Sequence, residues 1–395
     1  MKQFACPACG STGTQVFHEQ RKVPVNSCLL VDDYRTAIEF PRGDIALSFC
    51  RRCAFVANVA FDPERSRYTE HYEETQGFSP TFRRFAADLA RRWVDRYEIR
   101  DRDVLEIGCG KGEFLELMVE AGDNRGLGVD PSYVPGRVDE EPGRLAFIRD
   151  FWSAAYAALP ADVVVCRHTL EHIQPVGQFV ADLRAVVGDR PDRIVLFEVP
   201  DTLRVLEQAA FWDIYYEHCS YFSPGSLARL FRRCGFAPIG LDLAYDDQYV
   251  LLDAVPTCGA TDDAPEPELE LEDDLERSGR AVESFAERFE ARCARLRQAL
   301  DDAAKQDGPA VLWGAGSKAV SFVTTLGVGD EVKAAVDINP FKHGRYLAGS
   351  GHRVIAPEEL RDDPPGTVFV MNDIYLDEVA ADLRGMGMEP ELVAL

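Results

Sequence analysis

The feature that most constrains the fold of this 395-residue chain is the segment 104–115, with the sequence VLEIGCGKGEFL. A short apolar run leads into a turn containing Gly108, Gly110 and Gly112, and apolar residues then recur at helical spacing. This pattern predicts a buried strand, a tight turn and the start of a helix. Glycine permits a positive φ and lets a ligand approach the backbone closely. The segment therefore predicts a ligand site at a strand–helix turn.

A second predicted strand, residues 125–130, ends in Asp130. An acid about twenty residues after such a turn binds a ribose diol in dinucleotide folds. The glycine spacing meets neither the GxGxxG fingerprint nor the Walker pattern. With Glu106 before the turn, the segment resembles the S-adenosylmethionine (SAM) site of class I methyltransferases. The resemblance implies that SAM binds to Glu106, Gly108, Gly110, Gly112 and Asp130, and a generic strand–helix turn is the alternative.

Three further apolar runs predict strands at residues 145–151, 161–167 and 193–200, which alternate with helical segments. This alternation predicts an α/β fold of the class I SAM methyltransferase type, with a doubly wound, mostly parallel sheet and ligands at the carboxyl ends of its strands. The third strand ends near the expected adenine position, and the fourth ends beside the cofactor. We therefore add three residues to the expected cofactor site: Asp150, Phe151 and Arg167.

Two CxxC pairs precede this sheet, and a β-rich span separates them. Their thiolates predict a zinc-ribbon-like domain with the ligands Cys6, Cys9, Cys50 and Cys53. Because protein atoms fill all four positions, such a zinc ion is structural and not catalytic. A redox CxxC is the alternative, but that motif is expected once, beside a βαβ unit.

The composition restricts the class of partner. The formal net charge of −24 repels phosphate backbones and disfavours nucleic-acid binding. The first residues lack the apolar run of a signal peptide, and no segment approaches the ~20 apolar residues of a membrane span. Eleven cysteines in such a chain favour reduced thiols. We expect a cytoplasmic protein that binds neither nucleic acid nor membrane.

A second chemical motif, Tyr215-Tyr-Glu217-His218, follows the fifth predicted strand among aromatic residues. A histidine titrates near neutrality, and an aromatic wall with a neighbouring carboxylate tunes its pKa. We interpret His218 as a candidate general base, with Glu217 orienting or charging it. A hydrogen-bonded histidine packed in the core is the alternative.

Changes in composition divide the chain. We expect a zinc-binding domain and lid (1–80), a methyltransferase domain (81–257), an acidic linker with a long charged helix (258–307) and a C-terminal Rossmann-like domain (308–395). Residues 68–80, here called the lid segment, are aromatic and polar without a steady period. They are interpreted either as a lid over the ligand or as an ordinary linker.

The last domain opens with another strand and glycine turn, Gly314-Ala-Gly316-Ser317-Lys318, and its next predicted strand ends at Asp337. Ala319 replaces the third glycine of the NAD fingerprint. A glycine turn at a helix start also binds anions, and Lys318 adds a positive charge, so phosphate and NAD both remain open. The expected substrate-binding residues here are Gly316, Ser317, Lys318 and Asn339.

Together, the double CxxC, the SAM-type core, the Tyr-x-Glu-His motif and the Gly-Ala-x-x-Lys domain resemble the nucleotide-sugar C-methyltransferases over the whole chain. The resemblance implies that the zinc and SAM sites lie on one chain, with the sugar in the cleft facing the last domain. It implies catalytic roles for His218, Glu217, Tyr215, His172 and Tyr72, with His218 as the base. The lid segment and residues 24–30 depart from the family pattern, which indicates a divergent member.

The resemblance implies methyl transfer to the carbon α to a ketone of a nucleotide-linked deoxysugar through an enolate, whose oxygen His172 or Tyr215 stabilises. The expected partner is this small-molecule substrate, and the protein is expected as a monomer or homodimer. Three alternatives remain open. They are an O- or N-methyltransferase, an NAD-dependent oxidoreductase, and a zinc-stabilised binding protein without activity.

Overall fold

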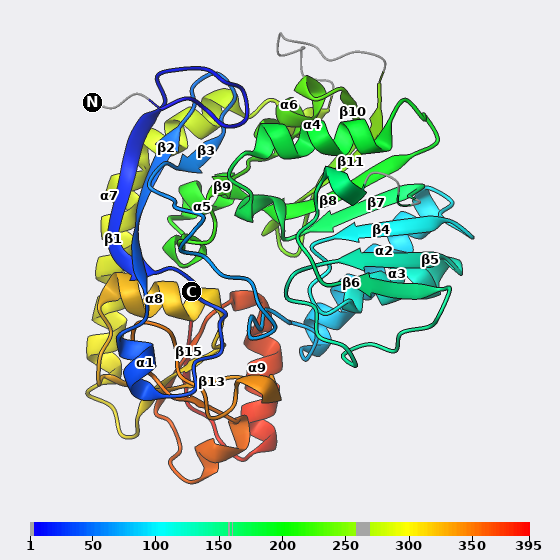
Figure 1. Ribbon diagram of the computed structural model, residues 1–395. Helices are drawn as coiled ribbons and strands as arrows, with labels where there is room; N and C mark the ends of the chain where they lie inside the picture. The colour runs from blue at the N-terminus through cyan, green and yellow to red at the C-terminus, as the bar shows by residue number, and fades with distance from the viewer. Residues whose placement is uncertain (1–3, 157–158, 160, 258–268) are drawn as a thin grey trace.

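The computed structural model describes residues 4–156, 159, 161–257 and 269–395 and contains three β-sheets with helices packed around them (Figure 1). The predicted acidic linker begins at Asp262, and its part up to residue 268 lies outside the described residues. Within the described ranges, no helix has the length and apolar character needed to cross a membrane.

The N-terminal sheet is antiparallel, in the order β1-β2-β3-β9. Strand β9 comes from far along the chain, directly after Glu217 and His218, and it pairs with β3. The candidate base is therefore attached to the N-terminal sheet as well as to the central part. The bounds are β1 (Gln15–Pro24), α1 (Tyr34–Ile38), β2 (Arg42–Phe49), β3 (Val56–Asn58) and β9 (Ser220–Tyr221).

The central sheet has seven strands in the order β10-β11-β8-β7-β4-β5-β6, and β8, β7, β4, β5 and β6 are parallel. This confirms the predicted α/β class. The strand order reverses at β4, so its glycine turn lies where ligands bind in such sheets. The bounds are β4 (Asp103–Ile107), β5 (Arg125–Val129), β6 (Leu145–Ile148), β7 (Val163–Arg167), β8 (Ile194–Pro200), β10 (Phe236–Ala244) and β11 (Tyr249–Pro256).

Helices bury their apolar faces against this sheet, as the spacing of Leu89, Trp93 and Phe114 requires. Ser79 caps α2 and Ser223 caps α6, and both caps precede a proline at the helix start. The bounds are α2 (Pro80–Arg96), α3 (Glu113–Gly122), η1 (Ala154–Tyr156), η2 (Leu170–His172), α4 (Val176–Val187), α5 (Thr202–Gln208), η3 (Phe211–Asp213) and α6 (Pro224–Arg233).

The long charged helix predicted within residues 258–307 is α7 (Leu275–Ala303), which follows the 3-10 turn η4 (Glu270–Glu272). Its apolar stripe packs on the N-terminal sheet, where Phe285 and Phe289 surround the buried His18. The helix then joins the C-terminal part through Leu296 and Leu300. It therefore lies along both parts as a packed element, as Figure 1 shows.

The C-terminal sheet is entirely parallel, in the order β14-β13-β12-β15-β16. The bounds are β12 (Ala310–Trp313), α8 (Ser317–Leu326), β13 (Val332–Val336), η5 (Pro340–Lys342), β14 (Val354–Ile355), η6 (Pro357–Arg361), β15 (Thr367–Val370), η7 (Asp373–Tyr375), α9 (Leu376–Gly385) and β16 (Glu391–Ala394).

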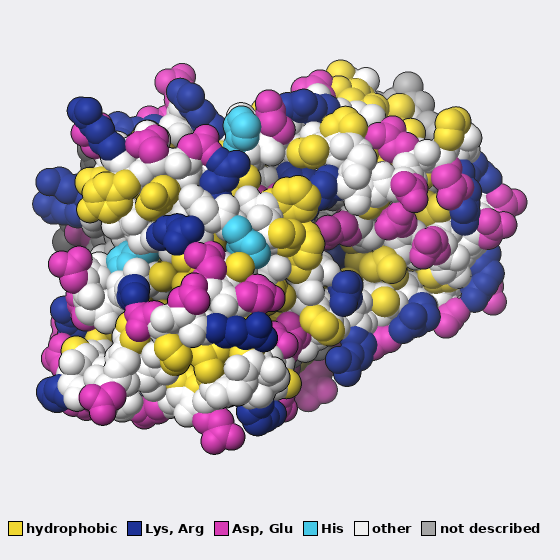
Figure 2. All heavy atoms as spheres, turned by 90° about the horizontal axis from the view of Figure 1, so that it is seen from below, with side chains coloured by type: hydrophobic (Ala, Val, Ile, Leu, Met, Phe, Trp, Pro, Cys, Tyr) yellow, Lys and Arg dark blue, Asp and Glu magenta, His cyan; other side chains and the backbone are white. Residues whose placement is uncertain are grey.

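On the face shown in Figure 2, acidic and basic side chains are interspersed.

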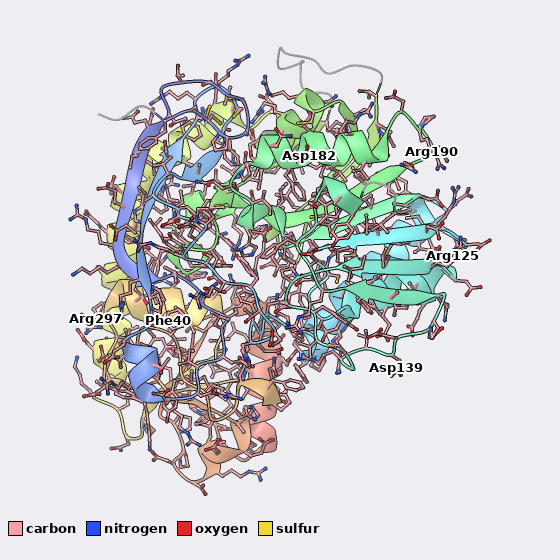
Figure 3. The ribbon with its side chains drawn as sticks, viewed as in Figure 1. Phe40, Arg125, Asp139, Asp182, Arg190 and Arg297 are labelled. Carbon is pink, nitrogen blue, oxygen red and sulfur yellow. The ribbon has the colours of Figure 1, made fainter. Side chains whose placement is uncertain are left out.

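The direction of the central strands determines where the site lies. Arg125 opens β5 and pairs with Asp101 and Asp103, and Arg190 lies shortly before β8. Both arginines are at the outer edge of the molecule in Figure 3. The carboxyl ends of the parallel strands therefore point the opposite way, toward the other two parts.

Candidate active site

A cavity of about 1300 Å³ lies where the three parts meet. Both glycine turns, the lid segment and the motif around His218 contribute to its wall. Most of the predicted residues line it: Tyr72, Glu106, Gly108, Gly110, Asp130, Phe151, Arg167, His172, Tyr215, His218, Gly316, Ser317, Lys318 and Asn339. Three predicted residues do not line the cavity: Gly112, Asp150 and Glu217.

The turn after β4 is built from glycines in positive-φ conformations. Gly108 has a φ of 71°, and a Cβ there would lie 1.9 Å from the hydroxyl oxygen of Thr169. At Gly112 a Cβ would collide with the Phe147 ring, so this glycine serves close packing and not ligand contact. The Gly110 N–H donates to the Asp130 carboxylate at 2.9 Å. This turn, here called the glycine cradle, therefore has no room for a side chain at Gly108 or Gly112.

The wall of this cradle is acidic. Glu106 is buried, and its Oε2 makes no hydrogen bond among the described residues. Burial raises the pKa of Glu106 to about 8, although Arg167 opposes this shift. The lid residue Glu74 also has a buried Oε2 without a hydrogen bond. Buried acceptors without donors, beside a glycine cradle, fit a cofactor that carries hydroxyls and positive charge, as SAM does.

Two predicted cofactor residues differ from expectation. Asp150 is exposed and outside the cavity, because its carboxylate turns back to accept from Phe151 N–H and the Tyr156 hydroxyl. Arg167 lines the cavity, but its guanidinium donates to Glu198 at 2.6 and 3.2 Å and lies over the Phe114 ring. Its charge is therefore neutralised within the protein. Phe151 is 61% exposed at the rim of the cavity, where its ring is free to stack on a ligand.

His218 is buried and faces the cavity. Its ring centroid lies 4.0 Å from that of Tyr215 and 4.8 Å from that of His172. No hydrogen bond to the His218 ring is present within the described part of the chain. Burial holds the pKa of His218 well below its ordinary value, and His172 adds to this shift. The ring is therefore neutral near neutral pH and able to accept a proton.

The expected pairing of Glu217 with His218 is wrong. The Glu217 carboxylate accepts from Ser27 N–H at 2.9 Å, the Ser27 hydroxyl at 2.6 Å and the Tyr72 hydroxyl at 3.0 Å. Adjacent side chains in this non-helical turn point apart, so His218 faces the cavity while Glu217 faces the loop after β1. Burial raises the pKa of Glu217, and the Ser27 hydrogen bond opposes this.

His172 lies at the end of η2 and lines the cavity beside His218. Its Nδ1 is 2.9 Å from the Tyr68 hydroxyl and 3.2 Å from the backbone oxygen of Glu217. Since both partners are at Nδ1, Nε2 is left for other groups. Sequence reasoning missed Tyr68 and Ser27 as site residues. Tyr68 is the first residue of the aromatic lid segment, and its place there is a signal in the sequence. No local sequence pattern distinguishes Ser27.

The second glycine turn forms the opposite wall. Gly316 precedes α8, and the Ser317 hydroxyl oxygen lies 2.7 Å from that of Ser27. Lys318 donates to Asp213 at 2.6 Å, so its ammonium has a partner from the central part. Asp337 accepts from Ala315 N–H at 2.8 Å. This wall therefore offers a ligand the N–H groups of the glycine turn, a lysine that already has an ion-pair partner and a carboxylate that already accepts a hydrogen bond.

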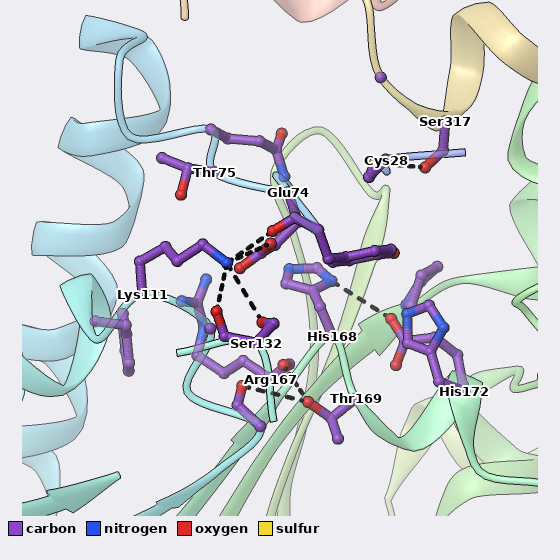
Figure 4. A pocket seen from close by; sticks show the side chains of 18 of the residues that line it. Cys28, Glu74, Thr75, Lys111, Ser132, Arg167, His168, Thr169, His172 and Ser317 are labelled. Atoms are coloured by element: carbon purple, nitrogen blue, oxygen red, sulfur yellow. Dashed lines mark hydrogen bonds and ion pairs between the residues drawn. The ribbon is translucent and has the colours of Figure 1, made fainter. Parts of the chain in front are cut away.

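The lid segment is held from both sides. The Glu73 carboxylate pairs with Arg137 at 2.9 Å and accepts from the Asn339 amide at 2.9 Å. The backbone of the segment pairs with the loop after β1, where Leu30 N–H donates to His71 O. Figure 4 shows Lys111 reaching beneath it toward Glu74 and Ser132, with His168 and His172 on the far side.

The four predicted zinc ligands come together. All four cysteines are buried, and their sulfur atoms lie within 4.8 Å of one another. The Cys6–Cys53 and Cys9–Cys50 sulfur pairs are each 3.6 Å apart. Zinc–sulfur bonds of about 2.3 Å give a tetrahedral edge of about 3.8 Å, so the cluster has the size of a zinc site. It packs on the central core, where Arg229 donates to Cys53 O.

Known protein families match both the central and the C-terminal part of the chain. Residues 81–240 match a methyltransferase domain family, and residues 268–389 match the C-methyltransferase C-terminal domain family. The chain is 25% identical over 343 residues to C-methyltransferase NovU of Streptomyces niveus, which covers 84% of this chain and 80% of that protein.

Solved structures with a likeness to part of the chain include two methyltransferases. One is the 1,6-didemethyltoxoflavin-N1-methyltransferase of Burkholderia thailandensis, at 20% identity over 44% of this chain and 79% of that one, with a TM-score of 0.33. The other is the magnesium protoporphyrin IX methyltransferase ChlM of Synechocystis PCC 6803, at 17% identity over 43% and 82%, with a TM-score of 0.34.

The matched families, together with the glycine cradle at the switch point of the sheet, define a SAM-dependent methyltransferase. The match to the C-terminal family and the relation to NovU show more. The C-terminal part matches the C-methyltransferase C-terminal domain family, and the chain is a divergent relative of C-methyltransferase NovU over most of its length.

Proposed function

We propose that this enzyme transfers a methyl group to the carbon α to the ketone of a nucleotide-linked deoxysugar, with His218 as the general base. The observation that carries the proposal is the state of His218. It is a buried imidazole that lines the cavity, and burial keeps it neutral. A carbon nucleophile must be formed by removing a proton, and a neutral imidazole accepts one.

The proposed reaction consists of proton removal followed by methyl transfer. His218 takes the proton from the α carbon, and the electron pair of the C–H bond becomes an enolate. Glu106, Gly108, Gly110 and Asp130 would hold SAM, which would supply the methyl group for the enolate carbon, with the neutral thioether S-adenosylhomocysteine as the leaving group. Protonated His218 then releases its proton to solvent.

The enolate oxygen requires a hydrogen-bond donor, and we assign it to His172 or Tyr215. Both line the cavity beside His218. Tyr68 lies at Nδ1 of His172, which leaves Nε2 for the substrate. A donor of this kind contributes about 2.7–4 kcal/mol to catalysis. Tyr72 and Glu217 act by holding the lid segment and the turn before β9 in place.

We assign the nucleotide part of the substrate to the C-terminal wall, at Gly316, Ser317, Lys318 and Asn339. The glycine turn begins a ten-residue helix, α8, whose first N–H groups favour an anion such as a diphosphate. Asp337 accepts from Ala315 N–H and also pairs with the Lys342 ammonium at 3.2 Å, which leaves this acid less suited to the ribose of NAD.

The test separates proton abstraction from methyl transfer. In D₂O with S-adenosylhomocysteine (SAH) in place of SAM, the wild-type enzyme should exchange the α proton of a nucleotide-linked keto-deoxysugar for deuterium, as NMR measures. His218→Ala should lose both this exchange and turnover while binding SAH as the wild type does. Turnover without exchange, with methyl on oxygen or nitrogen, would overturn the proposal.

We further propose that the cysteine cluster holds one structural zinc ion. Four buried sulfurs at tetrahedral spacing support this. None of the ten cysteines in the described residues forms a disulfide, which suits a reducing setting. The zinc would hold the N-terminal sheet against the central core and take no part in the chemistry.

A further inference from the structure

The lid segment places one carboxylate against the glycine turn that no other residue fully satisfies. Glu74 lines the cavity, and its Oε1 is so close to Gly110 that a Cβ there would lie 2.5 Å away. Its Oε2 is buried and makes no hydrogen bond among the described residues. Figure 4 shows this side chain pointing from the lid segment to the centre of the pocket.

Lys111 lies beneath Glu74 but does not satisfy it. Its side chain has no exposed surface, and its ammonium donates to Tyr72 O at 2.7 Å and Ser132 O at 2.9 Å. These bonds join the lid segment to the loop after β5. The distance from Lys111 Nζ to Glu74 Oε2 is 3.4 Å, which is an ion pair without a short hydrogen bond. Burial raises the pKa of Glu74 to about 7 despite Lys111.

SAM has a group that would donate a hydrogen bond to the unsatisfied oxygen of Glu74. Asp130, which directly follows β5, is placed for the ribose hydroxyls. Glu106, the other carboxylate beside this turn with an unsatisfied oxygen, belongs to β4, so Glu74 is the acid that the lid segment contributes, and it needs a donor of its own. The amino-acid end of SAM carries an α-ammonium with three N–H donors. Charge-assisted hydrogen bonds of this kind are the strong ones in a site shielded from water.

We propose that Glu74 accepts a hydrogen bond from the α-ammonium of SAM, and that Lys111 is a positioning residue that holds the lid segment over the cofactor. The lid segment then contacts SAM itself as well as the acceptor side of the cavity. The inference rests on SAM dependence and not on the identity of the acceptor or the base.

Calorimetry with two probes tests Glu74. SAH carries the amino-acid end, and 5′-methylthioadenosine lacks it. Glu74→Gln should weaken SAH binding at least about tenfold and leave methylthioadenosine binding unchanged. The matched control is Glu70→Gln, which removes an exposed lid carboxylate paired with Arg149 and should bind both probes as the wild type does. Unchanged SAH binding, or an equal loss for both probes, would overturn the role of Glu74.

Hydrogen exchange tests Lys111. SAH should increase the protection of residues 68–80 in the wild type, and Lys111→Met should lose that increase while residues 104–107 keep their protection. Full SAH-linked protection in Lys111→Met would overturn its positioning role. Both experiments omit the acceptor, so their outcome does not depend on whether His218 is the base.

Discussion

The hydroxyl of Tyr72 donates a 3.0 Å hydrogen bond to the carboxylate of Glu217, across 145 residues of sequence. The same carboxylate accepts from Ser27, whose hydroxyl oxygen lies 2.7 Å from that of Ser317. One buried acid thus joins the lid segment, the loop after β1 and the C-terminal wall. The backbone oxygen of Glu217 also lies 3.2 Å from His172 Nδ1. Glu217 therefore serves the site by joining its parts.

Removing either partner of this bond should reduce activity through the same defect. We expect Tyr72→Phe to lower kcat/KM for the acceptor about tenfold, because the buried Glu217 loses one donor. Glu217→Gln should cost more, since it also weakens the Ser27 bonds, and the double variant should be no worse than Glu217→Gln. Steady-state kinetics measures this, with Tyr34→Phe, an exposed tyrosine outside the cavity, as control. Fully additive losses would show that the two residues act separately.

A second prediction concerns the pH dependence of turnover. Burial lowers the pKa of His218 well below 6.5, so the neutral base persists below the usual histidine range. The acidic limb of the kcat/KM profile should therefore fall below pH 6.5, with activity flat from there to neutrality. The profile is measured by deuterium exchange at the α carbon with saturating SAH. Neither methyl transfer nor the raised pKa values of Glu74 and Glu106 at the cofactor site then shape the acidic limb. Half-loss of activity above pH 6.5 would point to another base.

Much of the central part could be predicted from the sequence because its signals are local. The segment 104–115 contains its strand, turn and helix start within twelve residues, and the order of strands and helices implies the parallel sheet. The hairpin of β10 and β11 was missed, although apolar alternation on both sides of Asp246 and Asp247 is a hairpin signal. These acids take positive φ at the turn.

The partners of Glu217 could not be predicted in this way. Ser27 lies 190 residues away in the chain, and such a contact produces no periodic pattern. The motif predicts that Glu217 orients His218, but neighbours in sequence are not always neighbours in space. The turn before β9 separates the two side chains, and contacts that are distant in sequence fix that turn, among them the pairing of β9 with β3 and the bond from Cys219 N–H to Glu171 O.

A third prediction concerns the cysteine cluster. Cys50→Ser should release one zinc per chain and lower the stability by about 3 kcal/mol or more, because metal binding contributes to folding. Elemental analysis and thermal unfolding measure the two effects. Cys28→Ser is the control, since Cys28 lies outside the cluster and contacts Ser317. A Cys50→Ser protein with full zinc content and unchanged Tm would show that the cluster holds no structural metal.

The last prediction concerns His18, a buried histidine of β1 far from the chemistry. Its ring packs against Phe285 and Phe289, and its Nε2 has no hydrogen bond among the described residues. Burial lowers the pKa of His18 from 6.5 to about 4. Between these two values the unfolded chain binds the proton and the folded protein does not. Stability is therefore lost as the pH falls from 6.5 toward 4.

The size of this effect follows from the shift. By pH 5 His18 should cost about 2 kcal/mol of unfolding free energy relative to pH 7. His18→Phe keeps an aromatic ring between the two phenylalanines and cannot take up the proton. Its Tm should therefore fall less than that of the wild type between pH 7 and pH 5, whereas His71→Gln, at an exposed position, should follow the wild type. Parallel acid curves for His18→Phe and the wild type would exclude His18 as a source of acid sensitivity.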